Sequence, residues 1–170
     1  MIVLNDAAGD SVATSSGQSE LDRLARDAGG GDPELIARLV AAVSPILVRY
    51  CRARMGRREG SYQEADEVAH EAGRAVLVAV PGYDGSPFLR LVHEIAVRTV
   101  DELAPGPAAP PAGTELMELL PALPALDRDI VMLRVGTGLS TEDTATVLGL
   151  SPGQVRLAQH QALLRLRSML

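Results

Sequence analysis

The chain is poor in the residues that usually make large, rigid cores. It has no tryptophan, one phenylalanine and three tyrosines, so aromatic residues make up only 2% of its 170 residues. Hydrophobic residues nevertheless reach 46%, which is enough for a folded core and excludes global disorder. Such a core has to be built from Leu, Val, Ile and Ala, and this composition favours helices.

Cysteine and histidine are also scarce. The single cysteine, Cys51, excludes an internal disulfide and is typical of a reducing compartment. The three histidines, His70, His93 and His160, are far apart in the sequence, and neither a nucleophile elbow nor a dinucleotide-binding fingerprint occurs. We therefore expect a protein that is not an enzyme and that uses neither a cofactor nor a metal ion.

Long apolar runs and lysines are missing as well. No stretch approaches the roughly 20 apolar residues of a membrane-spanning helix, and the first residues lack the pattern of a signal peptide, so we expect a cytoplasmic protein. All basic residues are arginines, and the net charge is −6, which argues weakly against non-specific nucleic-acid binding. The last acidic residue is Asp143, however, and the stretch after it is basic, with Arg156, Arg165 and Arg167.

Proline-rich and glycine-rich stretches divide the chain into two predicted helical domains. Residues 1–19 lack any hydrophobic period and predict a flexible tail. Residues 20–103 have helical periodicity, which Pro45 is expected to break or kink. The proline-rich stretch 104–113 predicts a stiff, extended linker, and residues 114–170 follow as a second helical domain. The expected fold is all-α, with two small domains.

Charged residues cluster at two places in the first domain. Five arginines lie between Arg49 and Arg58, and they form either an ordinary solvated helix face or a surface for an acidic partner or phosphates. Acidic residues crowd the first half of the next predicted helix, which starts near Ser61. The helix dipole stabilises acidic residues at this end, so part of the acidic cluster has a structural cause.

The C-terminal domain has the local signals of a helix-turn-helix. Ser140 and Asp143 have the spacing of a capping box at a helix start. Gly149 supplies the left-handed conformation that ends this helix. Ser151 is an N-cap, and Pro152 takes the first position of the next helix.

The spacing of Ala145, Gly149 and Val155 is that of the small residue, turn glycine and branched residue that fix the crossing of the two helices. An ordinary helical hairpin is the alternative. In a helix-turn-helix the second helix enters the major groove, where arginine reads guanine and glutamine reads adenine. The buried stripe is expected at Val155, Ala162 and Leu166. The residues expected to face DNA are Gln154, Arg156, Leu157, His160 and Gln161, with Arg165 further along, at a position suited to phosphates.

The stretch LPALPALDRDIVMLRVGTGLSTEDTATVLGLSPGQVRLAQHQALLRLR resembles region 4 of the extracytoplasmic-function (ECF) sigma factors of RNA polymerase. In the first domain, EADEVAHEA and FLRLVHEIA stand where region 2 of that family has an acidic helix and an aromatic-containing helix. Other stretches look closest to the actinobacterial sigma-D-like subgroup. The resemblance covers about residues 20–103 and 114–170.

The resemblance implies a transcription initiation factor. Region 2 of such proteins binds the clamp of the β′ subunit of core RNA polymerase and engages the −10 promoter element, and region 4 reads the −35 element. An anti-sigma factor is a further partner expected by resemblance. By position, the resemblance places polymerase-binding residues at Asp66, Glu67, His70 and Glu71, and it places Thr141 and Glu142 at a helix start close to DNA.

Region 2 departs from the family pattern in ways that bear on promoter opening. Leu91 and His93 replace a Trp and a Tyr, and Asp101 and Glu102 stand where the family continues with a basic run. Missing aromatics weaken stacking on flipped bases, and missing cations weaken phosphate binding. Three functions therefore stay open: a working initiation factor, a degenerate sigma-like regulator that binds polymerase or a partner without efficient promoter opening, and a plain helix-turn-helix regulator.

Overall fold

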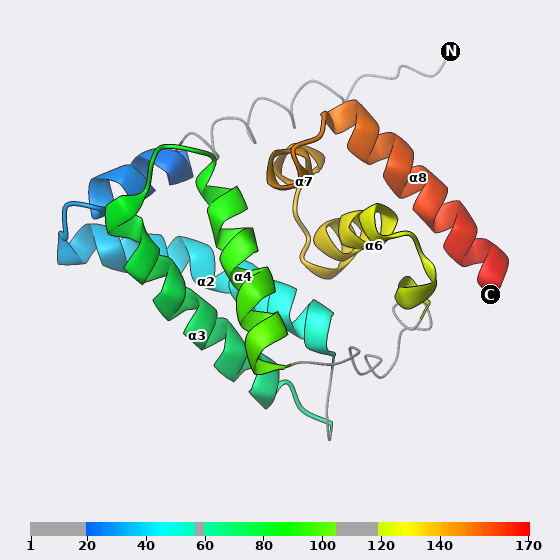
Figure 1. The fold of residues 1–170 in the computed structure, drawn as a ribbon, viewed down its shortest axis with the longest axis horizontal. Coiled ribbons are helices and arrows are strands. Elements are labelled where there is room, and N and C mark those ends of the chain that lie inside the picture. The colour runs from blue at the N-terminus through cyan, green and yellow to red at the C-terminus, as the bar shows by residue number, and fades with distance from the viewer. Residues whose placement is uncertain (1–19, 57–59, 105–118) are drawn as a thin grey trace, which may run out of the picture.

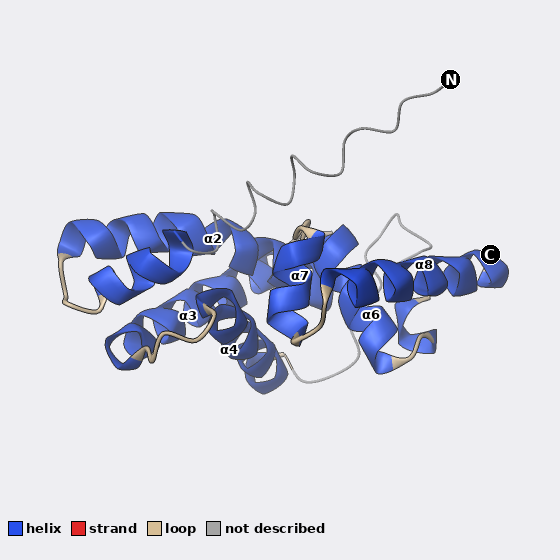
Figure 2. Ribbon diagram, turned by 90° about the horizontal axis from the view of Figure 1, so that it is seen from above, coloured by secondary structure: helices blue, strands red, loops and turns tan. Residues whose placement is uncertain are grey.

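The structure is a computed structural model, in which residues 20–56, 60–104 and 119–170 are described. The regular elements of these ranges are helices (Figures 1 and 2), as the predicted all-α fold requires. The predicted tail and nearly all of the predicted linker lie outside the described residues. Within the described ranges, no helix has both the length and the hydropathy that crossing a membrane demands.

The N-terminal half is a bundle of long helices. A helix over residues 20–28 precedes α2 (Pro33–Met55), α3 (Gln63–Ala79), the 3-10 turn η1 (Val80–Gly82) and α4 (Phe88–Leu103). Asp32 is the N-cap of α2, because its carboxylate accepts hydrogen bonds from the N–H groups of Glu34 and Leu35. Pro33 takes the first helical position.

Helix α2 runs through Pro45 and is not broken there. A proline inside a helix removes the hydrogen bond to the carbonyl four residues earlier, here that of Ala41. Ala41 and Pro45 both lie on the exposed side of α2, so water can bind the freed carbonyl. On the opposite side Val43 and Leu47 are buried, and their packing keeps the helix in place.

The start of α4 is capped by a residue far away in the sequence. The N–H of Phe88 donates to the carboxylate of Asp22 at 2.8 Å, and the Tyr83 hydroxyl lies 3.4 Å from the same oxygen. The rings of Tyr83 and Phe88 meet edge-on, with centroids 5.1 Å apart. Asp22 therefore fixes the helix over 20–28 against the start of α4.

A cavity of about 100 Å³ lies between α2 and α3, beside Gly73. Gly73 is inside α3, where a glycine costs about 0.5–1 kcal/mol relative to alanine. A Cβ atom at this position would meet the Leu47 side chain at 3.7 Å, an ordinary contact distance. The cavity therefore has room for a larger residue.

Substituting alanine for Gly73 is expected to raise the free energy of unfolding by about 0.5–1 kcal/mol, because it strengthens the helix and adds a contact. Urea denaturation of both proteins measures this difference. Gly149→Ala is the matched control and should destabilise, since Gly149 has a φ of +68°. An unchanged or lower midpoint for G73A would show that α3 has adapted to the glycine.

The C-terminal half consists of several short elements followed by one long helix. They are η2 (Leu120–Ala122), α6 (Ala125–Val131), the π-helical turn η3 (Met132–Gly136), α7 (Thr141–Leu148) and α8 (Pro152–Met169). The first residues of the predicted second domain, 114–118, lie outside the described residues, and its first described element is the 3-10 turn η2.

Both halves contribute to one continuous hydrophobic cluster. It includes Leu47 and Phe88 from the N-terminal half and Leu133 and Leu166 from the C-terminal half. Helix α4 packs against α7, and α2 packs against η3. Helix α8 lies on the far side of the C-terminal half from α2, α3 and α4 (Figure 1). The division into two domains remains a prediction.

Candidate functional site

The turn between α7 and α8 has the predicted helix-turn-helix geometry. The Ser140 hydroxyl accepts a hydrogen bond from the N–H of Asp143 at 3.0 Å, so Ser140 is the N-cap of α7. At the other end Gly149 is left-handed, and the N–H groups of Gly149 and Leu150 both donate to the Ala145 carbonyl. These contacts fix the turn that sets the direction of α8.

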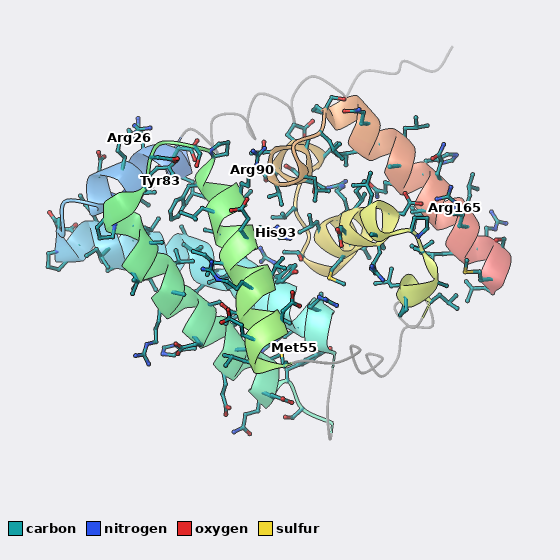
Figure 3. All side chains as sticks on the ribbon, viewed as in Figure 1. Arg26, Met55, Tyr83, Arg90, His93 and Arg165 are labelled. Carbon is teal, nitrogen blue, oxygen red and sulfur yellow. The ribbon has the colours of Figure 1, made fainter. Side chains whose placement is uncertain are left out.

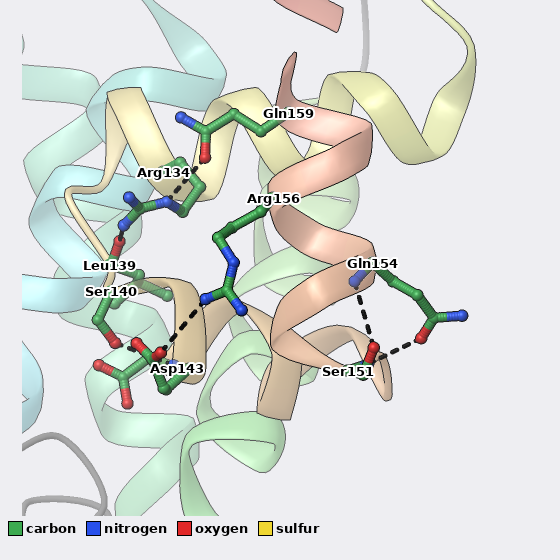
Figure 4. A network of polar contacts seen from close by, with 9 residues as sticks. Arg134, Leu139, Ser140, Asp143, Ser151, Gln154, Arg156 and Gln159 are labelled. Atoms are coloured by element: carbon green, nitrogen blue, oxygen red, sulfur yellow. Dashed lines mark hydrogen bonds and ion pairs between the residues drawn. The ribbon is translucent and has the colours of Figure 1, made fainter. Parts of the chain in front are cut away.

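The start of α8 is a complete capping box (Figure 4). The Ser151 hydroxyl accepts from the N–H of Gln154 at 3.2 Å, and the side-chain oxygen of Gln154 accepts from the N–H of Ser151 at 2.8 Å. Gln154 was predicted to face DNA, and it is exposed. The side-chain oxygen of Gln154 is bound by the N–H of Ser151. The side-chain NH2 group is therefore the part of Gln154 that can contact a base.

The buried stripe of α8 is the predicted one. Val155, Ala162 and Leu166 have no exposed surface. Val155 packs against Ala145 of α7 and Ile130 of α6, which is the contact that locks a helix-turn-helix. The stripe fixes which side of α8 faces solvent.

The predicted DNA-contacting residues of α8 all lie on that solvent side: Gln154, Arg156, Leu157, His160, Gln161 and Arg165 are exposed. Leu157 is 60% exposed. Thr141 and Glu142 are half-buried at the start of α7. Arg156 reaches toward this helix start, with its guanidinium 4.0 Å from the Glu142 carboxylate.

Arg165 has a structural partner, which the sequence did not indicate. Its guanidinium, on α8 (Figure 3), pairs with the carboxylate of Asp127 at the start of α6. Asp127 is 6% exposed, and a buried carboxylate is costly without a cation beside it. Arg165 therefore joins α8 to α6, whether or not it also contacts phosphates.

Sequence reasoning missed Arg134, which holds the two parts of the motif together. Its Nε donates to the side-chain oxygen of Gln159 on α8 at 3.0 Å, and its Nη1 donates to the Leu139 carbonyl just before α7 (Figure 4). The one signal in the sequence is a charged residue inside the apolar stretch VMLRV. Arg134 sets the position of α8 relative to the start of α7.

The predicted polymerase-binding residues divide into two groups. Glu67, His70 and Glu71 are exposed one helical turn apart on α3. Asp66 instead faces α2, and its two oxygens accept hydrogen bonds from the Arg52 guanidinium at 2.7 Å each. This pairing lowers the pKa of Asp66. Asp66 therefore fastens α3 to α2, and only the first group is free to meet a partner.

A wide, open hollow adjoins the exposed acidic residues. It was not predicted, and its walls include Arg52, Tyr62, Gln63, Glu67 and His70. The Arg52 guanidinium stacks over the Tyr62 ring at 5.2 Å, and the Gln63 amide donates to Glu67 at 3.1 Å. These contacts fix the positions of four side chains in the wall of the hollow.

The arginine cluster of α2 makes contacts within the protein. Arg49 donates to the Thr137 carbonyl at 2.7 Å, Arg52 pairs with Asp66, and Arg54 lies 3.5 Å from Asp101. Arg57 and Arg58 lie outside the described residues. Arg49, Arg52 and Arg54 therefore form neither a purely solvated helix face nor a wholly free surface for an acidic partner or phosphates. Each of the three contacts an oxygen atom in another part of the chain.

Helix α4 carries a half-buried histidine, His93, where the family has tyrosine. His93 meets the Tyr50 ring edge-on, with centroids 5.2 Å apart. Burial lowers the pKa of His93 and raises the pKa of Tyr50 to about 12. Both groups are therefore neutral near pH 7, and His93 supplies no charge for phosphate binding.

Cys51 of α2 is fully buried. Burial, with a smaller contribution from Asp66, raises the pKa of its thiol to about 12. The thiol is therefore protonated, and it acts as a small core residue. No group of three or more potential metal ligands occurs among the described residues.

Comparison with known proteins assigns the family. Residues 113–166 match the family described as Sigma-70, region 4. The chain is 39% identical over 174 residues to the ECF RNA polymerase sigma factor SigD of Mycobacterium tuberculosis, an alignment that covers 86% of this chain and 82% of the relative. The chain belongs to the ECF sigma factors. The predicted likeness to the sigma-D subgroup is thereby confirmed.

Further relatives agree with this assignment. This sigma factor is 36% identical over 170 residues to the ECF RNA polymerase sigma factor ShbA of Streptomyces griseus, which covers 82% of this chain and 89% of the relative. Its fold is similar to that of CnrH, solved in complex with the cytosolic domain of CnrY, with a TM-score of 0.65 and 22% identity over 87% of this chain and 95% of the other. It is therefore a transcription initiation factor, and not a plain helix-turn-helix regulator.

Proposed function

We propose that this sigma factor binds core RNA polymerase through α3 and directs it to promoters, where α8 reads the −35 element and α4 engages the −10 element. The observation that carries this proposal is the helix-turn-helix. Its second helix is locked by Val155 and Arg134, and its outer face is open. Run-off transcription with core polymerase on a promoter library tests the proposal, and product that depends on the chain supports it.

Reading of the −35 element is assigned to the exposed half of α8. Arg156 is the strongest candidate for a base contact, because it lies early in the helix and arginine can bind guanine with two hydrogen bonds. The side chain is 64% exposed, and its guanidinium lies 4.0 Å from the Glu142 carboxylate. This long ion pair orients the Arg156 side chain toward the start of α7 and leaves its guanidinium accessible to a base.

Replacing Arg156 with alanine is expected to weaken binding to the cognate −35 duplex by about 1–3 kcal/mol and to relax specificity at one base pair. Competition between the cognate duplex and single-base variants measures both effects. Arg167→Ala is the matched control, since Arg167 is exposed near the end of α8 and should affect all sequences alike. An equal loss of affinity for every sequence would make Arg156 a phosphate contact.

Binding to the clamp of the β′ subunit is assigned to Glu67, His70 and Glu71. They form a continuous exposed surface on α3, and two of them carry the negative charge that a basic partner surface would require. Asp66 contributes indirectly in this proposal, because its ion pair with Arg52 holds α3 in position. The protein acts as a binding factor in the cytoplasm, where RNA polymerase works, and not as an enzyme.

A degenerate regulator is the second candidate, and the composition of α4 favours it. Leu91 and His93 supply no large aromatic surface for flipped bases. Run-off transcription separates the two candidates, because a degenerate sigma factor would bind core polymerase and yield little product.

An anti-sigma factor is the third proposed partner. The likeness in fold to CnrH, solved in complex with the cytosolic domain of CnrY, supports this partner. Isolation of a protein that binds this chain and displaces it from core polymerase would support this proposal.

A further inference from the structure

The cavity beside Gly73 opens on the surface of the helix pair α2 and α3, and α3 carries the proposed polymerase surface. These two helices pack against each other (Figure 1). Buried side chains form the floor of the cavity: Val43, Leu47, Ala69 and Val76. Its rim is accessible to solvent, because Val40 is 38% exposed and His70 and Arg74 are exposed. We call this cavity the Gly73 pocket.

The Gly73 pocket has the size and the lining of a site for one apolar side chain. Its volume is about 100 Å³, and an apolar cavity of about 150 Å³ can hold a benzene molecule. Ser44, His70 and Arg74 are its polar lining residues, and the others are apolar. Displacement of water from an apolar hollow by an apolar group is favourable. The pocket is therefore suited to a partner's side chain of about the size of leucine or methionine.

His70 connects the pocket to the acidic residues of α3. It lines the Gly73 pocket and also the open hollow beside Glu67. Residues 67, 70, 74 and 77 are spaced by three or four, so they share one face of α3. Glu67 and Leu77 are about 15 Å apart along the helix, and a standard interface of about 800 Å² per partner spans more than this distance. A partner that covers the acidic residues therefore also reaches the pocket.

We propose that the Gly73 pocket receives one apolar side chain from the clamp of the β′ subunit, while basic side chains of the clamp meet Glu67 and Glu71. The inference rests on the proposed function and adds an apolar anchor to the charged contacts assigned to α3. Buried anchors in well-packed pockets dominate the affinity of many interfaces, whereas exposed charges mainly guide association. This role also accounts for a glycine inside α3, where it weakens the helix.

Filling the pocket from within the chain tests the proposal. Leucine in place of Gly73 should weaken binding of the full-length chain to core polymerase roughly tenfold or more, because it occupies the space of the partner's buried side chain. Alanine at this position should weaken binding less. Biolayer interferometry with immobilised core polymerase gives the dissociation constants. The matched control is A42L, which should bind as the natural chain does, since Ala42 is exposed on α2 and does not line the pocket.

Val40→Thr separates entry into the pocket from contact above it. Threonine has nearly the size of valine but adds a hydroxyl group, which an entering apolar side chain would strip of water. V40T should therefore weaken binding roughly fivefold or more. Circular dichroism should show the natural helical signal for every variant. Undiminished binding of G73L and V40T would overturn the proposal. A loss for G73L alone would mean that the partner covers the pocket without entering it, which also overturns the proposal.

A thiol at the rim of the pocket locates the partner directly. Cys51 is fully buried and protonated, so Ser44→Cys provides a single reactive thiol. Excess core polymerase should slow the alkylation of S44C by iodoacetamide roughly tenfold or more and should leave the matched variant A42C unaffected. Mass spectrometry of the modified peptides gives both rates. An unchanged S44C rate in the polymerase complex would overturn the proposal. A rate that falls as the chain alone is concentrated would assign the pocket to a second copy, and it would overturn the proposal as well.

Failure of this inference differs from failure of the proposed function. If the natural chain does not bind core polymerase, the proposed function fails, and the assigned occupant of the pocket fails with it. If the natural chain binds and E67K/E71K does not, while G73L and V40T bind normally, the polymerase surface stands and only the role of the pocket is wrong.

Discussion

Co-purification of this sigma factor with core RNA polymerase is expected to be lost when both Glu67 and Glu71 are changed to lysine. The two carboxylates are exposed one turn apart on α3. Glu71 has only a loose ion pair with Arg74 at 3.7 Å, and Glu67 accepts one hydrogen bond from Gln63. Their reversal places like charges against the proposed basic surface of the clamp, and such juxtaposition is strongly unfavourable. Pull-down with tagged core polymerase measures the loss.

The control for this variant is Glu94→Lys combined with Glu102→Lys. These residues are exposed on α4, and their reversal changes the net charge by the same amount. Retention of binding in the control and loss in E67K/E71K would assign the effect to the surface of α3. Undiminished binding of E67K/E71K would refute the assigned polymerase surface.

Replacement of Phe88 by alanine is expected to lower the free energy of unfolding by about 3–5 kcal/mol. Phe88 is fully buried, it is the one phenylalanine of the chain, and its ring packs edge-on against Tyr83. Its backbone N–H is also the group that Asp22 caps. Because small proteins are stable by only about 5–15 kcal/mol, this loss removes a large part of the stability. Urea denaturation measures it.

Phe88→Leu is the conservative comparison and should cost less than about 1.5 kcal/mol, because it keeps most of the buried volume. A loss below about 1 kcal/mol for F88A would mean that neighbouring leucines and valines refill the cavity. In that case the packing around α4 would be more adaptable than the burial of Phe88 indicates.

The helix-turn-helix could be predicted in detail because its signals are local. The caps at Ser140 and Ser151 and the left-handed Gly149 depend on neighbours within a few residues. Local hydrogen bonds and helical periodicity therefore determined both the motif and the solvent side of α8.

Local reasoning failed where a side chain has a distant partner. Asp66 was grouped with its acidic neighbours, and Arg165 with the phosphate contacts, yet Arg52 and Asp127 engage them. Of the two effects predicted for Pro45, the break is wrong, because α2 continues through this residue to Met55, and the kink stays a prediction.

The sequence alone indicated the helical class and the helix-turn-helix, which depend on periodicity, caps and spacing, and it indicated the family through a resemblance to known motifs. Tertiary structure decided which charged residues remain available. Arg49 and Thr137 are 88 residues apart, and Arg90 and Thr146 are 56 residues apart, so no local pattern links them. Such contacts form only when the packing of apolar faces has already brought distant segments together.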